Sequence, residues 1–101
     1  MYVRAANVLV RPEKMQEVID LHNDSLIPAA KAQKGWQGSY LMTDADGGKI
    51  LSITVWESEA EMLACESGTG DLQEQVAKFD SVFSEPPNFS HYELTAEASA
   101  A

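Results

Sequence analysis

Cysteine, basic residues and long apolar runs are all scarce in this chain of 101 residues. The single cysteine, Cys65, cannot form a disulfide within the chain, and no set of cysteines and histidines has the spacing of a zinc site. There is no apolar run of about 18 residues and no basic-plus-apolar leader. We therefore expect a soluble, cytoplasmic protein without a membrane segment or a metal.

Positive charge is also in short supply. The chain has 7 Lys and Arg residues against 16 Asp and Glu, a formal net charge of -9, and no basic cluster. Such a surface repels nucleic-acid phosphates and anionic lipid head groups, so neither nucleic acid nor a membrane surface is an expected partner. The remaining composition, 45% hydrophobic and 8% aromatic, fits one domain with one core.

The stretch from Gly47 to Glu61 passes directly from a strand into a helix. Residues 49–56 are mostly β-branched or apolar and follow a Gly-Gly turn signal, which predicts a mostly buried strand. Ser58 and Glu61 have the spacing of a capping box, in which both side chains satisfy free backbone N–H groups. We expect the helix to begin at Ser58 and to end near Ser67.

A strand and a helix precede this stretch. Residues 2–10 alternate between two largely apolar faces, which predicts a strand. Pro12 suits the first position of a helix, and Pro28 should bend or interrupt that helix. Between the two prolines, side chains at three- and four-residue intervals form one stripe of the helix. Its members are Met15, Val18, Ile19, His22 and Leu26.

A hairpin and a final strand complete the pattern. Residues 36–43 predict a strand that the Asp44–Gly48 turn returns antiparallel into residues 49–56. Asp71 is in a capping position and predicts a third, short helix. Residues 89–95 predict the last strand.

The order strand, helix, strand, strand, helix, strand predicts an α+β, ferredoxin-like βαββαβ fold with a four-stranded antiparallel sheet. Right-handed crossovers place both helices on one face. We expect the other face to carry Val8, Val10 and the row from Ile50 to Trp56, which is too apolar to face water. This predicts a homodimer through the sheet faces, a dimeric α/β barrel, or else cover by a partner protein. The domain should span residues 1–95, and residues 96–101 should form a flexible C-terminal tail.

Three pieces of the chain resemble one known family. They are Leu26–Trp36 leading into a strand, the strand-to-helix passage Ile53–Ser58, and the polar residue Asn7 in the first strand. In this order, over about residues 2–94, they resemble the antibiotic biosynthesis monooxygenase (ABM) domains of the dimeric α/β-barrel superfamily. The resemblance implies a homodimer with a small-molecule pocket in each subunit between sheet and helices. Some members oxidise aromatic polyketides with O₂ and no cofactor, some degrade haem, and many have no assigned reaction.

The haem-degrading branch is a poorer match than the rest of that family. Its members also have an asparagine at the position of Asn7, but they use a tryptophan on the second helix and a histidine on the following helix as well. Cys65 stands here at the position of that tryptophan, and residues 71–84 contain no histidine. Axial haem ligation by that route is not expected, and no cofactor is predicted.

Two polar side chains are candidates for catalysis. Asn7 alternates with Val3, Ala5 and Leu9, so we expect it to face the helices, either as a structural hydrogen-bonding group or as a ligand contact. His22 lies on the apolar stripe of the first helix and should reach the same cavity. There it is either a structural group whose hydrogen bonds are satisfied or a general base near neutral pH.

Five further residues are predicted to bind substrate, and most of them also have a structural interpretation. Trp56 is most simply a packing residue. Cys65 shares its helix with Met62 and is more simply an inert core thiol, because no base or cation is adjacent in the sequence. Tyr40 and Tyr92 can each place a hydroxyl in the pocket, depending on the register of their strands.

The favoured interpretation is a monooxygenase of the ABM kind that oxygenates a small aromatic or apolar substrate without a cofactor. His22 would remove a proton, the carbanion would reduce O₂, and Asn7 or a tyrosine hydroxyl would stabilise the oxyanion. One alternative is a non-catalytic ligand-binding or structural dimer in which Asn7 and His22 satisfy each other. Another is an isomerase or decarboxylase that uses the same histidine.

Overall fold

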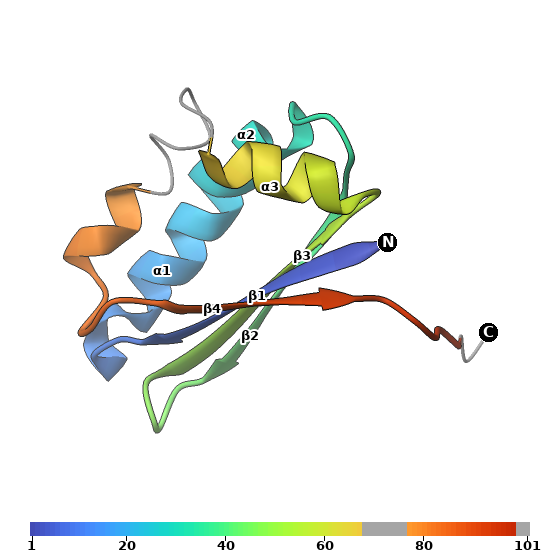
Figure 1. Cartoon of the computed structure of the whole chain (residues 1–101). Coiled ribbons are helices and arrows are strands. Elements are labelled where there is room, and N and C mark those ends of the chain that lie inside the picture. Colours follow the sequence, from blue (N-terminus) through green and yellow to red (C-terminus); the bar gives the residue numbers. More distant parts are fainter. Residues whose placement is uncertain (68–76, 99–101) are drawn as a thin grey trace.

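The computed structural model describes residues 1–67 and 77–98. It shows one antiparallel sheet with helices on one of its faces (Figure 1). The strands lie in the order β2-β3-β1-β4. Their bounds are β1 (Tyr2–Leu9), β2 (Trp36–Asp44), β3 (Lys49–Trp56) and β4 (Asn88–Glu93). The predicted ferredoxin-like α+β fold is confirmed.

The helical segments follow β1 and β3. After β1 come a short 3₁₀ turn, two α-helices and an intervening π turn, namely η1 (Pro12–Lys14), α1 (Met15–Leu21), η2 (His22–Leu26) and α2 (Ile27–Lys31). After β3 come α3 (Glu59–Ser67) and the 3₁₀ turn η3 (Lys78–Ser81). Among the described residues, no helix is long and apolar enough to cross a membrane.

A π turn interrupts the first helix just before Pro28. The N–H of Ile27 donates to the carbonyl oxygen of His22, five residues earlier, instead of the four-residue spacing of an α-helix. Pro28 has no N–H to donate to the carbonyl of Asp24, so regular α-helical bonding cannot continue there. The prediction that Pro28 interrupts this helix is confirmed.

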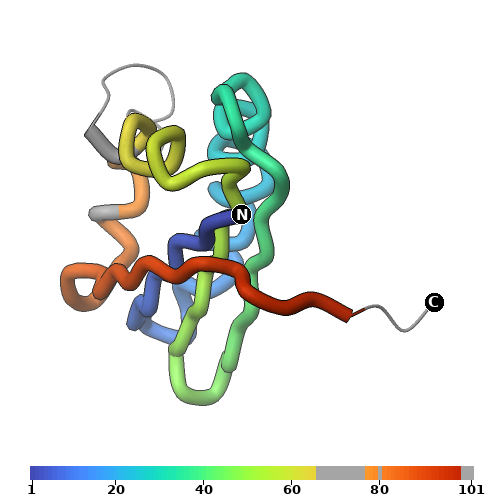
Figure 2. Tube along the Cα trace, turned by 45° about the vertical axis from the view of Figure 1, so that its right-hand side comes forward, coloured from blue at the N-terminus to red at the C-terminus, as the bar shows by residue number. Residues whose placement is uncertain are grey.

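Half of the predicted capping box is present at the start of α3, because Ser58 accepts a backbone N–H and Glu61 does not. The N–H of Glu61 donates to Ser58 Oγ at 3.2 Å, and Ser58 Oγ donates to Glu61 Oε1 at 3.0 Å. The carboxylate therefore bonds the cap hydroxyl rather than a backbone N–H. Asp71, the predicted start of a third helix, lies outside the described residues, as do residues 99–101 of the predicted tail. Figure 2 shows the described chain after β4 running away from the body of the domain.

The faces of the sheet are the reverse of those predicted. Arg4, Ala6 and Val8 line a cavity under the helices, so the alternate row of β1, which contains Asn7, faces away from them. Ala6 pairs with Ser52, and Val8 pairs with Ile50, so the row from Ile50 to Trp56 also lies under the helices. Both rows of β1 are apolar enough to be buried, and alternation alone does not say which row the helices cover.

The outer face of the sheet carries a different apolar set from the one predicted. The rows that face away from the helices include Val3 and Leu9 of β1, Tyr40 and Met42 of β2, Leu51, Ile53 and Val55 of β3, and Tyr92 of β4. We call these residues the open sheet face. Tyr40 and Tyr92 are 62% and 59% exposed on it.

Two clusters of buried side chains fill the space between sheet and helices. The first joins the end of β1 to α1 and η3, and contains Val8, Val10, Met15, Val18, Ile50, Phe79 and Val82. The second joins the end of β3 to α2 and α3, and contains Ala29, Ala30, Trp56, Met62 and Cys65. Leu26 packs against both clusters and connects them.

Gly48 at the tip of the β2–β3 hairpin should be required for stability. Its φ of 64° is unfavourable for other residues, and a Cβ there would collide with the carbonyl oxygen of Val10. We expect Gly48→Ala to lower the free energy of unfolding by about 2 kcal/mol in urea titrations. Gly47→Ala is the matched control, since its Cβ would meet only side-chain atoms of Asp44 and Lys49. A Gly48→Ala variant as stable as this control would contradict the prediction.

Candidate functional site

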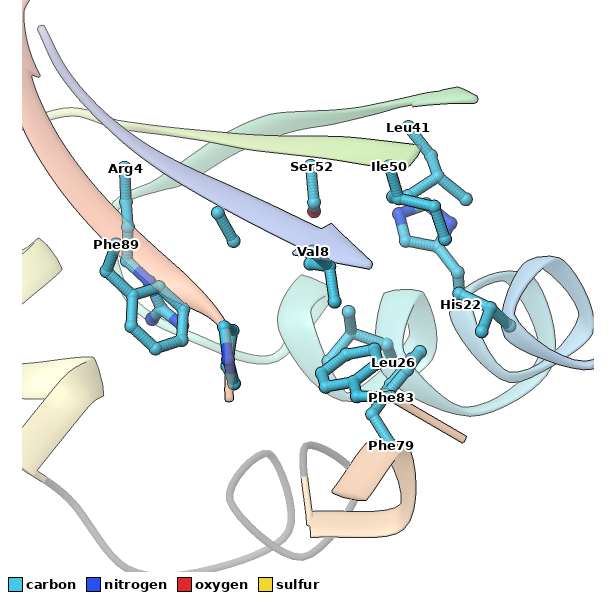
Figure 3. Close-up of a pocket in the computed structure, with 13 residues that line it drawn as sticks. Arg4, Val8, His22, Leu26, Leu41, Ile50, Ser52, Phe79, Phe83 and Phe89 are labelled. Carbon is cyan, nitrogen blue, oxygen red and sulfur yellow. The ribbon is translucent and has the colours of Figure 1, made fainter. Parts of the chain in front are cut away.

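A cavity of about 100 Å³ lies between the sheet and the helices, inside the first core cluster (Figure 3). Its lining is mainly apolar and includes Val8, Val18, Leu26, Ile50, Phe79 and Phe83. The two phenylalanine rings have their centroids 5.7 Å apart. In another protein, an apolar cavity of about 150 Å³ stays dry and binds benzene. The present cavity is smaller, so it limits the apolar part of a ligand to at most about one six-membered ring.

His22 is the buried polar side chain of this cavity. It is 6% exposed, and its Nδ1 lies 3.2 Å from Asn23 Oδ1. An amide oxygen only accepts hydrogen bonds, so this contact is a hydrogen bond when Nδ1 carries the proton; in the neutral imidazole of that tautomer, Nε2 has a lone pair. Nε2 is buried and has no hydrogen-bond partner within residues 1–67 and 77–98. Such a group usually has a partner in a folded protein, which makes it a candidate ligand contact.

The π turn determines where the histidine lies. His22 is the first residue of η2, and it follows α1 without a break in the chain's helical path. The helical stripe from Met15 and Val18 continues into His22, so the imidazole is directed to the sheet rather than to solvent. Single π turns inside helices occur frequently at functional sites. The turn lies directly before Pro28, whose missing N–H interrupts the regular α-helical hydrogen bonding.

Two further polar side chains line the same cavity from the sheet. Arg4 of β1 places its guanidinium carbon 4.6 Å from the centroid of the Phe89 ring on β4, a cation–π contact. Ser52 of β3 contributes a hydroxyl that lies between the Arg4–Phe89 pair and His22, as Figure 3 shows. Arg4 is the one charged side chain among the described residues that line the cavity.

Asn7 does not reach this cavity. It is exposed on the outer side of β1, where it pairs in register with Leu51 and Asn88. The expectation that it faces the helices is wrong, because the neighbouring residues Ala6 and Val8 occupy that side. Asn7 and His22 therefore cannot satisfy each other, as the structural alternative required.

The five residues predicted to bind substrate also lie away from the cavity. Trp56, Met62 and Cys65 belong to the second core cluster, where Trp56 is 2% exposed and its indole N–H donates to Thr54 Oγ1 at 3.1 Å. This arrangement fits packing roles. Tyr40 and Tyr92 lie on the open sheet face. Of the seven predicted site residues, the structure places His22 in the cavity.

Sequence reasoning missed Arg4, Ser52 and Phe89. One signal was present in the sequence. Arg4 interrupts an otherwise apolar row of β1 in an acidic chain, and a lone cation in such a row indicates either a solvent-facing strand or a polar group at a cavity. Phe89 carried no signal of its own, because its contact depends on the pairing of β4 with β1 across most of the chain. No group of three His, Cys, Asp or Glu residues in the described parts of the chain could hold a metal ion.

The fold and the cavity can now be compared with known proteins. The family model for antibiotic biosynthesis monooxygenases matches residues 1–69, which is more than half of the sequence. The chain belongs to the antibiotic biosynthesis monooxygenase family. The match contains β1, the helix with the π turn, the β2–β3 hairpin and the whole of α3. No curated protein matches the chain.

Solved structures share the whole ABM fold. One is a Bordetella bronchiseptica protein described as a putative antibiotic biosynthesis monooxygenase. It is 19% identical, with a TM-score of 0.81, over 94% of this chain and 97% of its own. Rv0793 from Mycobacterium tuberculosis is 19% identical, with a TM-score of 0.75, over 97% of this chain and 98% of its own. A Nitrosomonas europaea protein of unknown function is 19% identical, with a TM-score of 0.75, over 99% of this chain and 95% of its own. At this identity the likeness shows the fold alone.

Asn23 should hold the tautomer of His22 in this ABM protein. We expect ¹⁵N NMR of the neutral imidazole to show the proton on Nδ1 in the wild type. In Asn23→Ala, the Nδ1–H loses its acceptor, so the population with the proton on Nε2 should rise. Asn7→Ala is the matched control, because it removes the same amide from the opposite face of the sheet. An unchanged tautomer in Asn23→Ala would contradict the assignment.

Proposed function

We propose that this ABM protein is a monooxygenase that oxygenates a small aromatic or apolar substrate in the cavity without a cofactor. The observation that carries the proposal is the buried Nε2 of His22, which has an apolar surrounding and no hydrogen-bond partner among the described residues. A base in such a position can accept a proton from a bound substrate, because no described protein group competes for the nitrogen.

The proposed reaction starts with proton transfer. His22 Nε2 takes a proton from an activated CH₂ group, and the carbanion gives one electron to O₂. The two radicals combine, so that a C–O bond forms, and the peroxide takes the proton back from the imidazolium. Loss of water across the remaining C–H and the O–O bond then leaves a ketone. In sum, CH₂ and O₂ become C=O and H₂O, and the substrate supplies all four electrons.

The negative charge that develops on the substrate requires a donor in the cavity. Asn7, Tyr40 and Tyr92 lie on the outer side of the sheet, so none of them serves this role within one subunit. The hydroxyl of Ser52 and the guanidinium of Arg4 are the donors that line the cavity. A donor in a largely apolar surrounding stabilises an oxyanion more than it would in water. We assign this role to Ser52, which lies closer to the middle of the cavity in Figure 3.

Oxygen uptake tests the proposed reaction. The wild type should consume O₂ with at least one member of a panel of anthrones and one-ring compounds that carry an activated CH₂ group, and His22→Gln should lower the rate about 100-fold or more, because the base is lost. Asn7→Ala should keep the wild-type rate. If the wild type consumes no O₂ but exchanges substrate protons with D₂O, an isomerase is favoured. If it does neither, the proposal fails.

We also propose that two copies associate through the open sheet face. This face is apolar, and its most exposed members, Tyr40 and Tyr92, are more than half accessible. Contiguous apolar surface of this kind on a small protein usually marks an interface. A twofold dimer in which each sheet covers the other would bury the set in both copies at once. The helices and the cavity would remain on the outside of that dimer.

Charge on the open sheet face should separate the two copies. We expect the double variant Tyr40→Glu and Tyr92→Glu to sediment as a monomer at concentrations where the wild type is a dimer, because buried carboxylates would face each other without partners. Leu63→Glu is the matched control, since it adds a charge at an exposed apolar position on α3. A wild type that sediments as a monomer at all accessible concentrations would contradict the dimer.

A further inference from the structure

We propose that the ligand of this cavity is an uncharged one-ring ketone, whose carbonyl oxygen accepts a hydrogen bond from Ser52 and whose adjacent CH₂ group faces Nε2 of His22. The inference rests on the proposed function and names the substrate class of the same site. Three features of the cavity carry it: its volume, the spacing of its polar groups along β3, and the apolar side chains around them.

Strand β3 sets the spacing between the polar groups. Ile50 and Ser52 both line the cavity, and they are two residues apart on β3, about 7 Å along the strand. In Figure 3 the imidazole of His22 lies at the Ile50 end of the cavity. A ligand that contacts His22 therefore reaches the level of Ser52 when it is about one ring long.

Arg4 lies beyond the reach of such a ligand. It pairs with Thr54, which is two residues past Ser52 and so about 7 Å further along β3. Its guanidinium carbon is 4.6 Å from the centroid of the Phe89 ring, at the opposite end of the cavity from His22 (Figure 3). A volume of about 100 Å³ limits the apolar part of a ligand to at most about one ring. A one-ring ligand held at His22 therefore ends near Ser52.

The surroundings of this part of the cavity favour a ligand without charge. The side chains that enclose it are apolar, namely Val8, Leu26, Ile50, Phe79 and Phe83. A carboxylate would find there the one hydroxyl of Ser52 for its two oxygens, and a buried charge with too few hydrogen bonds is costly. A ketone oxygen carries no charge, and one donor is enough to satisfy it. Ser52 can supply that donor.

The order of the polar groups identifies the reacting carbon. With the carbonyl oxygen at Ser52, the CH₂ group next to the carbonyl can face His22 Nε2, which accepts a proton when Nδ1 carries the proton of the neutral imidazole. Loss of a CH₂ proton moves negative charge onto the carbonyl oxygen, where the Ser52 hydroxyl stabilises it. In the proposed reaction this CH₂ group and O₂ become a second carbonyl group and water, so the product is a 1,2-diketone.

Cyclohexanone and methylenecyclohexane test the contact with Ser52, because they have nearly the same shape and differ in the acceptor. In NMR titrations followed at Val8 and Phe79, Ser52→Ala should weaken the binding of cyclohexanone about five- to tenfold and that of methylenecyclohexane less than about twofold. Ser90→Ala is the matched control, because Ser90 pairs with Ala5 in the row that faces away from the helices and lies outside the lining. It should leave both affinities unchanged. Ser52→Cys nearly keeps the shape but has a weak donor, so it should also weaken cyclohexanone.

Hydrogen–deuterium exchange tests the position of the CH₂ group. In oxygen-free D₂O, the wild type should accelerate exchange of the protons next to the carbonyl of cyclohexanone. His22→Gln should lower this catalysed rate at least about tenfold, because the base is lost. Asn7→Ala should keep the wild-type rate, since this side chain lies on the outer side of the sheet.

The outcomes separate this inference from the proposed function. An equal effect of Ser52→Ala on both probes, or no catalysed exchange in the wild type, would overturn the ligand class but leave oxygenation to the uptake assay with the whole panel. Cyclohexanecarboxylate that binds the wild type more tightly than cyclohexanone would also overturn it, because the favoured ligand would then be charged. Ketone-specific weakening and catalysed exchange, with no O₂ uptake from any panel compound, would support the ligand class while the proposed oxygenation fails.

Discussion

The fold depends on the fact that successive side chains of a strand point to opposite faces of one sheet. With helices on one face only, each row of β1 is either under the helices or outside. That choice decides where the cation of Arg4, the amide of Asn7 and the tyrosines of β2 and β4 lie. Every functional statement about this protein follows from which row is covered. The packing of α1 and η3 on the row of Ala6 and Val8 settles it.

Local features of the sequence were enough to predict most of the elements that the structure describes. The Gly-Gly turn, the Ser58 cap and the effect of Pro28 all concern residues within a few positions of each other, and the structure shows each of them. The topology followed from the order of these elements and from the handedness of crossovers. The covered face could not be read in the same way, since both rows of β1 are apolar and a shift of one residue exchanges them.

The candidate site shows the same division between local and distant information. His22 was predictable, because a helix has one apolar stripe and that stripe must face the sheet. Arg4 and Phe89 meet only because β4 pairs with β1, a contact between residues far apart in the chain. Asn7 was misplaced for a related reason: a polar residue in an apolar row suggests a buried site, although an open sheet face accommodates it equally well.

The division of the buried residues into two clusters also bears on how such a protein can change over generations. Trp56 and Met62 pack one half of the interior tightly, whereas the half around Val8 and Phe79 contains the cavity. Substitutions of residues that line the cavity can alter its shape while the second core cluster, which contains Trp56, continues to hold the helices against the sheet. A lineage built on this plan can therefore acquire new ligands by small steps without passing through unfolded ancestors.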